Sequence, residues 1–458
     1  MRRADRSRLP QVGPDPGFRF PTIVRQSLPN GLQLRTIEHP SVPVITFVLL
    51  VEGGSGADPS ALEGLAAMTA DMVDEGTGSL SAIDVSEAIA RIGAEYDVDV
   101  GADATVFSLT TLKRFAGRGA ALLADMVTRP SLREADFERV RQLRLDRLTQ
   151  LKDLPPAVAE RAFLRLVYGN HPYGHLPIGS DASLRAMTLD DVVRHHRAAF
   201  SAGRATLVVA GAMSHDELTR VASDAFGDWR QSVEGEAPAG APDIAATGAG
   251  RIRLAVVPRD GAAQSELRIG QLAARRDTPD YSALLVMNAV LGGQFVSRIM
   301  LKLREEKGFT YGARTGFDWH RGLGPFSLQT SVETRSTAEA IRDSLDEFEA
   351  LRSSRPPTDE EMLVARASLT RGYPRNFETA QQVARSVAQL ALYGLPDSYF
   401  EEFTPKIQAV TADGVVDVAR RYLDPPALTT LVVGDHAAIA ESLQTLGLGD
   451  AQILPSGV

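Results

Sequence analysis

The chain consists of two related halves, and this internal repeat limits its fold more than any other feature of the sequence. The segments Phe107–Thr111 and Ala186–Val193 are followed by the similar segments Phe326–Thr330 and Ala409–Val416, about 220 residues later and in the same order. Chance likeness between amphipathic helices explains one such match but not several in one order. The sequence therefore predicts two homologous domains, and its 458 residues are indeed too many for one ordinary core.

Each half is expected to combine strands joined by hairpins with runs of helices. In the first half we expect strands at 26–34 and 42–52, helices at 62–73 and 81–92, strands at 94–100 and 105–112, then two helices and a strand at 205–211. Capping boxes at 131–134 and 358–361 predict corresponding helix starts in the two halves. This order indicates an α+β fold with mainly antiparallel sheets rather than alternating βαβ units.

The domain boundaries follow from changes in composition. Residues 235–250 are rich in Gly, Pro and Ala with little apolar periodicity, which is typical of an exposed linker. Residues 1–19 are basic and rich in Pro and Gly, and we expect a flexible arm there. The two domains are thus predicted to span 20–234 and 251–458.

Composition excludes several classes of protein. The chain has no cysteine, so disulfides, thiolate metal sites and a Cys nucleophile are excluded. A net charge of −9 argues against non-specific nucleic-acid binding. No apolar run is long enough to span a membrane, and the N-terminal segment has no apolar stretch of the signal-peptide type. We expect a soluble protein, with the cytoplasm favoured and the periplasm possible if a signal peptide was trimmed.

One segment carries the main functional information. Residues 64–77 read Gly-Leu-Ala-Ala-Met-Thr-Ala-Asp-Met-Val-Asp-Glu-Gly-Thr. This resembles the Gly-Leu-Ala-His-x-x-Glu-His-x-x-x-x-Gly-Thr segment of the pitrilysin/insulinase/mitochondrial-processing-peptidase family, the zinc peptidases with an inverted motif. The family's His, Glu and His fall on Ala67, Ala70 and Asp71, and its third ligand, a Glu from a later helix, falls on Arg147.

These substitutions leave no set of zinc ligands. Zinc needs three protein ligands that converge at about 2 Å, plus an open position for water. Ala67 and Ala70 have no donor atoms in their side chains, one carboxylate is not a site, and Arg147 is a cation. We therefore expect no metal in this chain.

Two interpretations of Arg147 remain open. It is expected to share a helical face with Val140, Leu143 and Leu151, so it could point inward and pair with Asp71 across the former zinc site. Alternatively, it extends past its own helix to solvent. The neighbouring residues Arg139, Arg141 and Arg144 fit an ordinary solvated face.

The histidines offer no second metal site. His171 and His175 have a His-x-x-x-His spacing, but the intervening Pro and Gly predict a loop that resembles a family loop without a metal role. His195 and His196 are adjacent, about 100° apart on their helix, and cannot chelate one ion together.

The second half retains a different family signature. Residues 303–312 read Leu-Arg-Glu-Glu-Lys-Gly-Phe-Thr-Tyr-Gly, which closely resembles the family's Leu-Arg-Glu-x-x-Gly-Leu-x-Tyr segment. The resemblance implies that Arg304 and Tyr311 grip a carbonyl oxygen of the peptide substrate, which suits two strong hydrogen-bond donors. The alternative is that Arg304 bridges the nearby Glu305 and Glu306 while Tyr311 packs. The preceding segment 292–298 resembles a family turn that leads into the Arg-bearing helix.

The resemblance also implies an architecture and a role. In the family, two homologous α+β domains form half of a clamshell, and in some heterodimers one subunit bears zinc while the other bears the Arg/Tyr pair. This chain fits the second role, in which it binds and orients peptide for a paralogous partner that holds the zinc. The rival prediction is a non-catalytic scaffold like the family members in the core of respiratory complexes. A self-sufficient hydrolase has no visible catalytic constellation.

Overall fold

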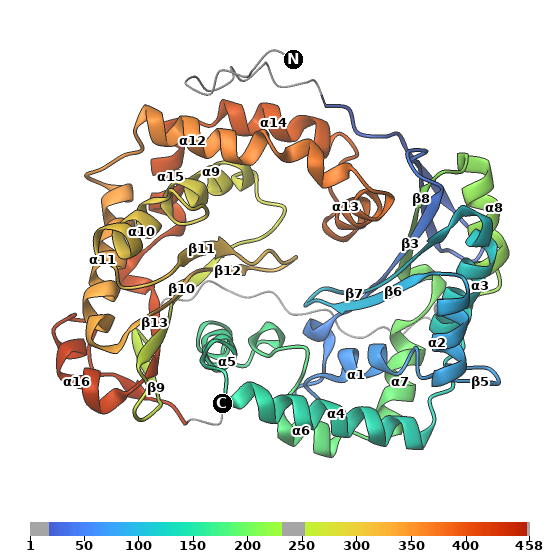
Figure 1. The fold of residues 1–458 in the computed structure, drawn as a ribbon, viewed down its shortest axis with the longest axis horizontal. Helices are drawn as coiled ribbons and strands as arrows, with labels where there is room; N and C mark the ends of the chain where they lie inside the picture. Colours follow the sequence, from blue (N-terminus) through green and yellow to red (C-terminus); the bar gives the residue numbers. More distant parts are fainter. Residues whose placement is uncertain (1–17, 231–251, 456–458) are drawn as a thin grey trace, which may run out of the picture.

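The computed structural model describes residues 18–230 and 252–455, and these residues form two sheets of six strands each (Figure 1). The first sheet has the order β1-β2-β8-β3-β7-β6, and the second has the order β11-β12-β10-β13-β9-β14. The first sheet consists of β1 (Ile23–Ser27), β2 (Gln33–Glu38), β3 (Val44–Glu52), β6 (Glu95–Val100), β7 (Ala104–Leu112) and β8 (Ala205–Gly211). The second consists of β9 (Leu254–Pro258), β10 (Gln264–Ala274), β11 (Ala313–Phe317), β12 (Gly324–Glu333), β13 (Thr429–Gly434) and β14 (Gln452–Ile453).

The two sheets repeat one topology. Reading the second sheet backwards, β9, β13, β10, β12 and β11 take the places of β2, β8, β3, β7 and β6. The pair β2 and β8 is parallel and so is the pair β9 and β13, whereas β3 and β10 are each antiparallel to both neighbours. The predicted α+β class, the two homologous domains and their mainly antiparallel sheets are therefore confirmed.

Helices surround both sheets. The first half contains α1 (Leu65–Asp71), α2 (Ala82–Arg91), α3 (Ala116–Thr128), α4 (Glu134–Lys152), α5 (Pro155–Tyr168), α6 (Asp181–Ala186), α7 (Leu189–Ala199) and α8 (His215–Phe226). The second contains α9 (Tyr281–Leu291), α10 (Arg298–Met300), α11 (Thr337–Arg352), α12 (Asp359–Thr370), α13 (Ala380–Tyr393), α14 (Tyr399–Ala409), α15 (Ala412–Tyr422) and α16 (His436–Gln444). Within the described ranges, no helix is both long and apolar enough to cross a membrane.

The two halves exchange one helix each. Helix α13 of the second half packs on β3 and β8 of the first sheet, on the face opposite α3 and α8 (Figure 1). Helix α5 of the first half packs on β10 and β13 of the second sheet, where Phe163 lies among Val257, Leu431 and Val433. The approach is close: a Cβ atom added to Gly270 would lie 2.9 Å from the Phe163 ring. Each sheet is thus covered on one face by a helix from the other half.

Three local predictions were wrong. The expected strand 26–34 is a hairpin of β1 and β2, because Pro29, Asn30 and Gly31 form a turn in which Gly31 has a φ of 89°. Five helices, α3 to α7, lie between β7 and β8 where two were expected. The capping box at Thr358 and Glu361 is confirmed, but α4 begins at Glu134 after Arg133 without a side-chain cap.

The predicted linker at 235–250 lies outside the described residues, as do residues 1–17 of the predicted arm. The arm's last aromatic residue, Phe18, lies within the described range and stacks on Phe377 at 5.0 Å between ring centroids. The next aromatic residue, Phe20, is buried in the same aromatic group against Phe400. The chain therefore enters the first sheet after packing on helices of the second half.

Candidate functional site

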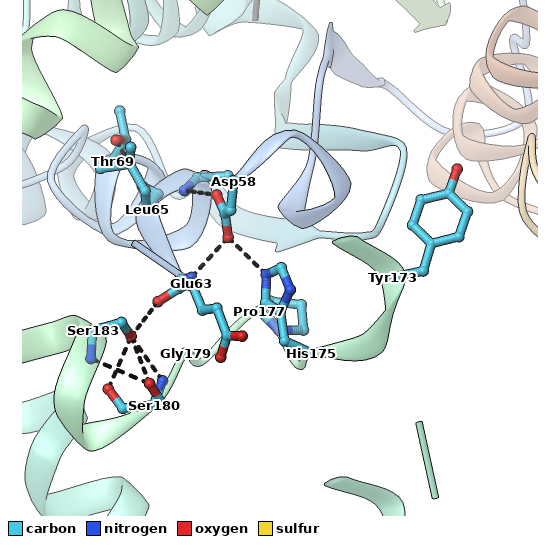
Figure 2. Close-up of polar contacts among 12 residues, drawn as sticks. Asp58, Glu63, Leu65, Thr69, Tyr173, His175, Pro177, Gly179, Ser180 and Ser183 are labelled. Carbon is cyan, nitrogen blue, oxygen red and sulfur yellow. Dashed lines mark hydrogen bonds and ion pairs between the residues drawn. The ribbon is translucent and has the colours of Figure 1, made fainter. Parts of the chain in front are cut away.

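A buried carboxylate fixes the start of α1, the helix that carries the altered motif. Asp58 accepts hydrogen bonds from the backbone N–H groups of Gly64 at 2.7 Å and Ala66 at 2.8 Å. Its Oδ2 also lies 3.0 Å from Nε2 of His175 (Figure 2). Asp58 therefore satisfies N–H groups that have no partner inside the helix and joins α1 to the loop after α5.

The motif positions on α1 carry no metal ligands beyond one carboxylate. Ala67 is 5% exposed and Ala70 is fully buried, so both present methyl groups to the core. Asp71 is 38% exposed, and its Oδ2 accepts a hydrogen bond from Nη1 of Arg144 at 2.5 Å. Two methyl groups and a carboxylate already paired with a guanidinium do not fit zinc. Among residues 18–230 and 252–455, no group of three or more His, Asp or Glu side chains could hold a metal ion.

The predicted ion pair between Asp71 and Arg147 is wrong, because Arg144 takes that place. Arg147 is exposed and donates to Oε1 of Gln150 on its own helix. Arg144 is largely buried and also donates to the backbone oxygen of Pro177 at 2.7 Å. The expectation of a solvated Arg144 was therefore wrong as well.

The error has a physical cause in the rotation of α4. The helix buries Phe137, Val140, Leu145 and Leu148, and Arg144 shares that face, one turn after Val140. Leu143, which was expected to point inward, is 57% exposed. Because Leu143 points outward and Arg144 points inward, the buried face of α4 is rotated by one residue from the face that the apolar pattern predicts. The rotation of α4 about its axis is set by packing against α1 and not by periodicity alone.

Sequence reasoning missed two further groups beside this site. Burial, together with the neighbouring charges of Glu75 and Asp71, raises the pKa of Asp74, which follows α1, to about 6. Burial also raises the pKa of Tyr96 on β6 well above its usual value, with Asp74 and Asp71 contributing. The hydroxyl of Tyr96 has no hydrogen-bond partner among the described residues. Only the run of acids at Asp71, Asp74 and Glu75 could have pointed to this environment.

The histidines have structural partners. His175 contacts Asp58, as described above, and Nε2 of His196 lies 2.9 Å from the backbone oxygen of Val127. Burial lowers the pKa of His196 to about 4, so this side chain is neutral at pH 7. His171 and His175 lie on the predicted loop, where His171 caps the turn that contains Tyr173.

Arg304 and Tyr311 lie at the surface of the second half. A π-helical segment, Leu301–Glu306, carries Arg304, and such segments are frequent at functional sites. The Arg304 guanidinium lies 4.5 Å above the centroid of the Phe295 ring, and its Nε lies 3.3 Å from Glu305. Tyr311 is 92% exposed, so the alternative in which it packs is wrong. Of the two acids named in that alternative, Glu305 contacts Arg304, whereas Glu306 pairs with Lys302.

A buried ion pair anchors this segment. Nε and Nη2 of Arg298, at the start of α10, donate to the two carboxylate oxygens of Glu361 at 2.6 and 2.8 Å. The same guanidinium donates to the backbone oxygens of Arg355 and Pro356. Phe295, Val296 and Leu301 are exposed around it. The segment is thus anchored at Arg298, and its exposed apolar residues include Phe295, which contacts Arg304.

Two family models match the sequence. The model described as Insulinase (Peptidase family M16) matches residues 35–179, and the model described as Peptidase M16 inactive domain matches residues 186–369. An uncharacterized zinc protease of Mycobacterium bovis is 27% identical over 419 residues, which cover 90% of this chain and 93% of the relative. The mitochondrial-processing peptidase subunit beta of Mus musculus is 23% identical over 437 residues, which cover 93% of this chain and 88% of the relative.

Solved structures show the same fold. A peptidase M16 inactive domain from Pseudomonas fluorescens has a TM-score of 0.83 at 24% identity, over 90% of this chain and 98% of that one. A protease from Helicobacter pylori has a TM-score of 0.83 at 19% identity, over 90% of this chain and 99% of that one. Together the two family models cover most of the sequence, and the fold agrees with them. The chain belongs to the M16 family of insulinase- and mitochondrial-processing-peptidase-like proteins.

Proposed function

We propose that this chain is the substrate-orienting subunit of a two-chain M16 peptidase, whose metal is held by a paralogous partner. The observation that carries the proposal is the exposure of Tyr311, which is 92% exposed beside the segment of Arg304. A tyrosine this exposed contributes little to the stability of the chain, so its place is better explained by a contact outside it. The α1 site, with Ala67, Ala70 and the paired Asp71, supports a chain that does not hold the metal itself.

The chemistry of the pair suits a peptide carbonyl group. A guanidinium and a phenol both donate hydrogen bonds, and neither needs to change its charge to do so at pH 7. Donors aimed at a carbonyl oxygen stabilise the negative charge that develops when that carbon is attacked. Arg304 and Tyr311 would therefore bind and polarise the substrate, while the partner supplies the metal and the water that it activates.

The second candidate is a non-catalytic scaffold. The contacts of Arg304 with Glu305 and Phe295 favour it, because they give the guanidinium partners within its own chain. The two candidates differ in one measurable way. A scaffold tolerates changes at Arg304 and Tyr311 without loss of peptidase activity in the complex.

The test is co-expression of the chain with a zinc-motif-bearing paralogue from the same genome. Cleavage of a quenched fluorescent peptide should require both chains. It should fall by about 10²–10³ with Arg304→Ala and by about tenfold with Tyr311→Phe. Arg335→Ala is the matched control, because Arg335 is exposed in the same half and pairs with Glu333. Full activity in both Arg304→Ala and Tyr311→Phe would reject the assignment and favour the scaffold.

A further inference from the structure

A cavity of about 590 Å³ lies next to the α1 site. The C-terminal end of α4, one side of α5 and the segment 174–186 form its walls. Its polar lining includes Glu63, Lys152, Arg161, Arg165, His175 and Ser180. Glu63, His175, Ser180 and Ser183 of this wall are drawn in Figure 2. The cavity is large enough for a few amino-acid residues of a peptide.

One of the three cations in the lining, and both of its acids, already have partners. Arg165 pairs with Glu63 at 2.6 Å, so these two charges cancel. The other acid of the lining, Asp181, pairs with Arg185 on the outer side of α6 at 2.8 Å. Arg161 and Lys152 remain, and no carboxylate of the described residues lies within 4.0 Å of either side chain. The cavity therefore has an excess of positive charge.

Arg161 is the more informative of the two. It is partly buried, and Nη1 donates to the backbone oxygen of Gly179 at 2.8 Å. Burial lowers the pKa of its guanidinium more than the nearby charge of Glu63 raises it, and Arg165 adds to the lowering, so the cation is only partly compensated. Buried charges are normally paired, and guanidinium groups pair best with carboxylates. The described residues supply no carboxylate that pairs with Arg161. A bound ligand can supply one.

The rest of the lining is apolar. Leu148, Leu151, Val158 and Leu176 contribute hydrophobic surface to the same cavity. An inorganic anion would leave this surface unused, whereas a peptide would place its carboxylate on Arg161 and a side chain against the leucines. We propose that this cavity binds a carboxylate of a peptide, either its C-terminal carboxylate or an acidic side chain, through Arg161.

The position relative to the α1 site gives this pocket a use. Arg144 donates to the backbone oxygen of Pro177, and the segment around Pro177 separates Asp71 from the cavity. Along α4, Lys152 follows Arg144 by two turns, which is about 12 Å. A peptide of a few residues is long enough to cover this distance. The inference rests on the proposed function only in taking a peptide as the carrier of the carboxylate.

The test uses the complete chain without a partner, so its result is independent of peptidase activity. The probes are fluorescein-labelled ten-residue peptides of Ala, Leu and Lys that differ in their carboxylates. One ends in a free carboxylate, a second is amidated, and a third is amidated and contains one Glu. Fluorescence anisotropy should detect binding of the first, the third or both, and no binding of the second. Binding of the first alone identifies the C-terminal carboxylate, and binding of the third alone identifies the side chain.

Variants separate this site from general electrostatic attraction. Arg161→Met should weaken binding by about tenfold or more, as expected for a lost charge-assisted hydrogen bond. Lys152→Gln, on the exposed rim, should weaken it by about threefold without affecting the fold. Arg91→Gln is the control, because Arg91 on α2 is exposed, pairs with Glu87 and lies outside the lining, so it should leave affinity unchanged. Equal binding of all three peptides, or equal loss in Arg161→Met and Arg91→Gln, would overturn the proposal.

Discussion

Arg144 on α4 and Asp71 on α1 form an ion pair, with 2.5 Å between Nη1 and Oδ2. The guanidinium also donates to Pro177, so it holds α4, α1 and the loop after α5 together. Asp71 therefore has its partner on α4, three residues before the position that the sequence predicted.

Removal of this arginine should destabilise the fold. Arg144→Met should lower the free energy of unfolding by about 1–2 kcal/mol, mainly through the lost hydrogen bond to Pro177 and lost packing. The ion pair itself contributes little, because Asp71 is 38% exposed. Guanidinium-chloride unfolding followed by circular dichroism measures the change. Arg147→Met is the control and should be within about 0.5 kcal/mol of the unchanged protein; equal effects of the two would contradict the assignment.

The same geometry predicts which change would restore metal binding. Ala67→His and Asp71→His put two imidazoles four residues apart on α1, and Arg144→Glu puts a carboxylate where a guanidinium now contacts residue 71, so this triple variant should bind about one zinc per chain. A second triple variant, with Arg147→Glu in place of Arg144→Glu, should bind no zinc, because Arg147 points to solvent. Mass spectrometry of the metal content after dialysis distinguishes the two. Zinc in the second variant but not in the first would show that Arg147 faces α1.

Asp74 should make stability depend on pH. Its pKa is raised from 3.8 to about 6 in the folded chain, so folding favours the protonated form. The contribution of Asp74 to the free energy of unfolding is most favourable below pH 3.8 and is lost as the pH rises toward 6. Asp74→Asn should therefore be more stable than the unchanged protein by about 1–3 kcal/mol at pH 7, and similar to it near pH 4. Urea unfolding at intervals from pH 4 to pH 8 checks this; a difference independent of pH would refute it.

The anchor beneath Arg304 should matter more than surface ion pairs. Arg298→Met leaves Glu361 without its guanidinium and two backbone oxygens without their donor, which should cost about 2–4 kcal/mol. Thermal unfolding of the variant measures the loss. Arg335→Met removes an exposed pair with Glu333 and should change stability by less than about 0.5 kcal/mol. Similar unfolding temperatures for Arg298→Met and Arg335→Met would show that the pair of Arg298 and Glu361 does not anchor the segment.

The sequence predicted most of what depends on local pattern. The repeat, the strands around Phe107 and Phe326 and the helix start at Thr358 follow from periodicity and capping, which act over a few residues. Tyr311 is exposed, and its contact with substrate stays a prediction.

The predictions that failed depend on tertiary contacts. The predicted partner of Asp71, Arg147, lies about one helical turn from the observed one, because α4 turns Leu143 outward and Arg144 inward. Ser131 does not cap α4, since the helix begins only at Glu134. The cavity at Arg161 combines side chains from α4, α5 and the loop 174–183 that no local pattern brings together.

The exchange of α5 and α13 has a consequence for biosynthesis. Val48, Leu50 and Val208 of the first sheet are covered by α13, which begins at Ala380, so that face stays open while most of the chain is being synthesised. Contacts of such long sequence separation are formed late and slow the folding reaction. The first half should therefore leave the ribosome as a partly folded intermediate that needs chaperones. Gene fragments that encode either half alone should yield aggregated protein, whereas co-translation of both should rescue solubility.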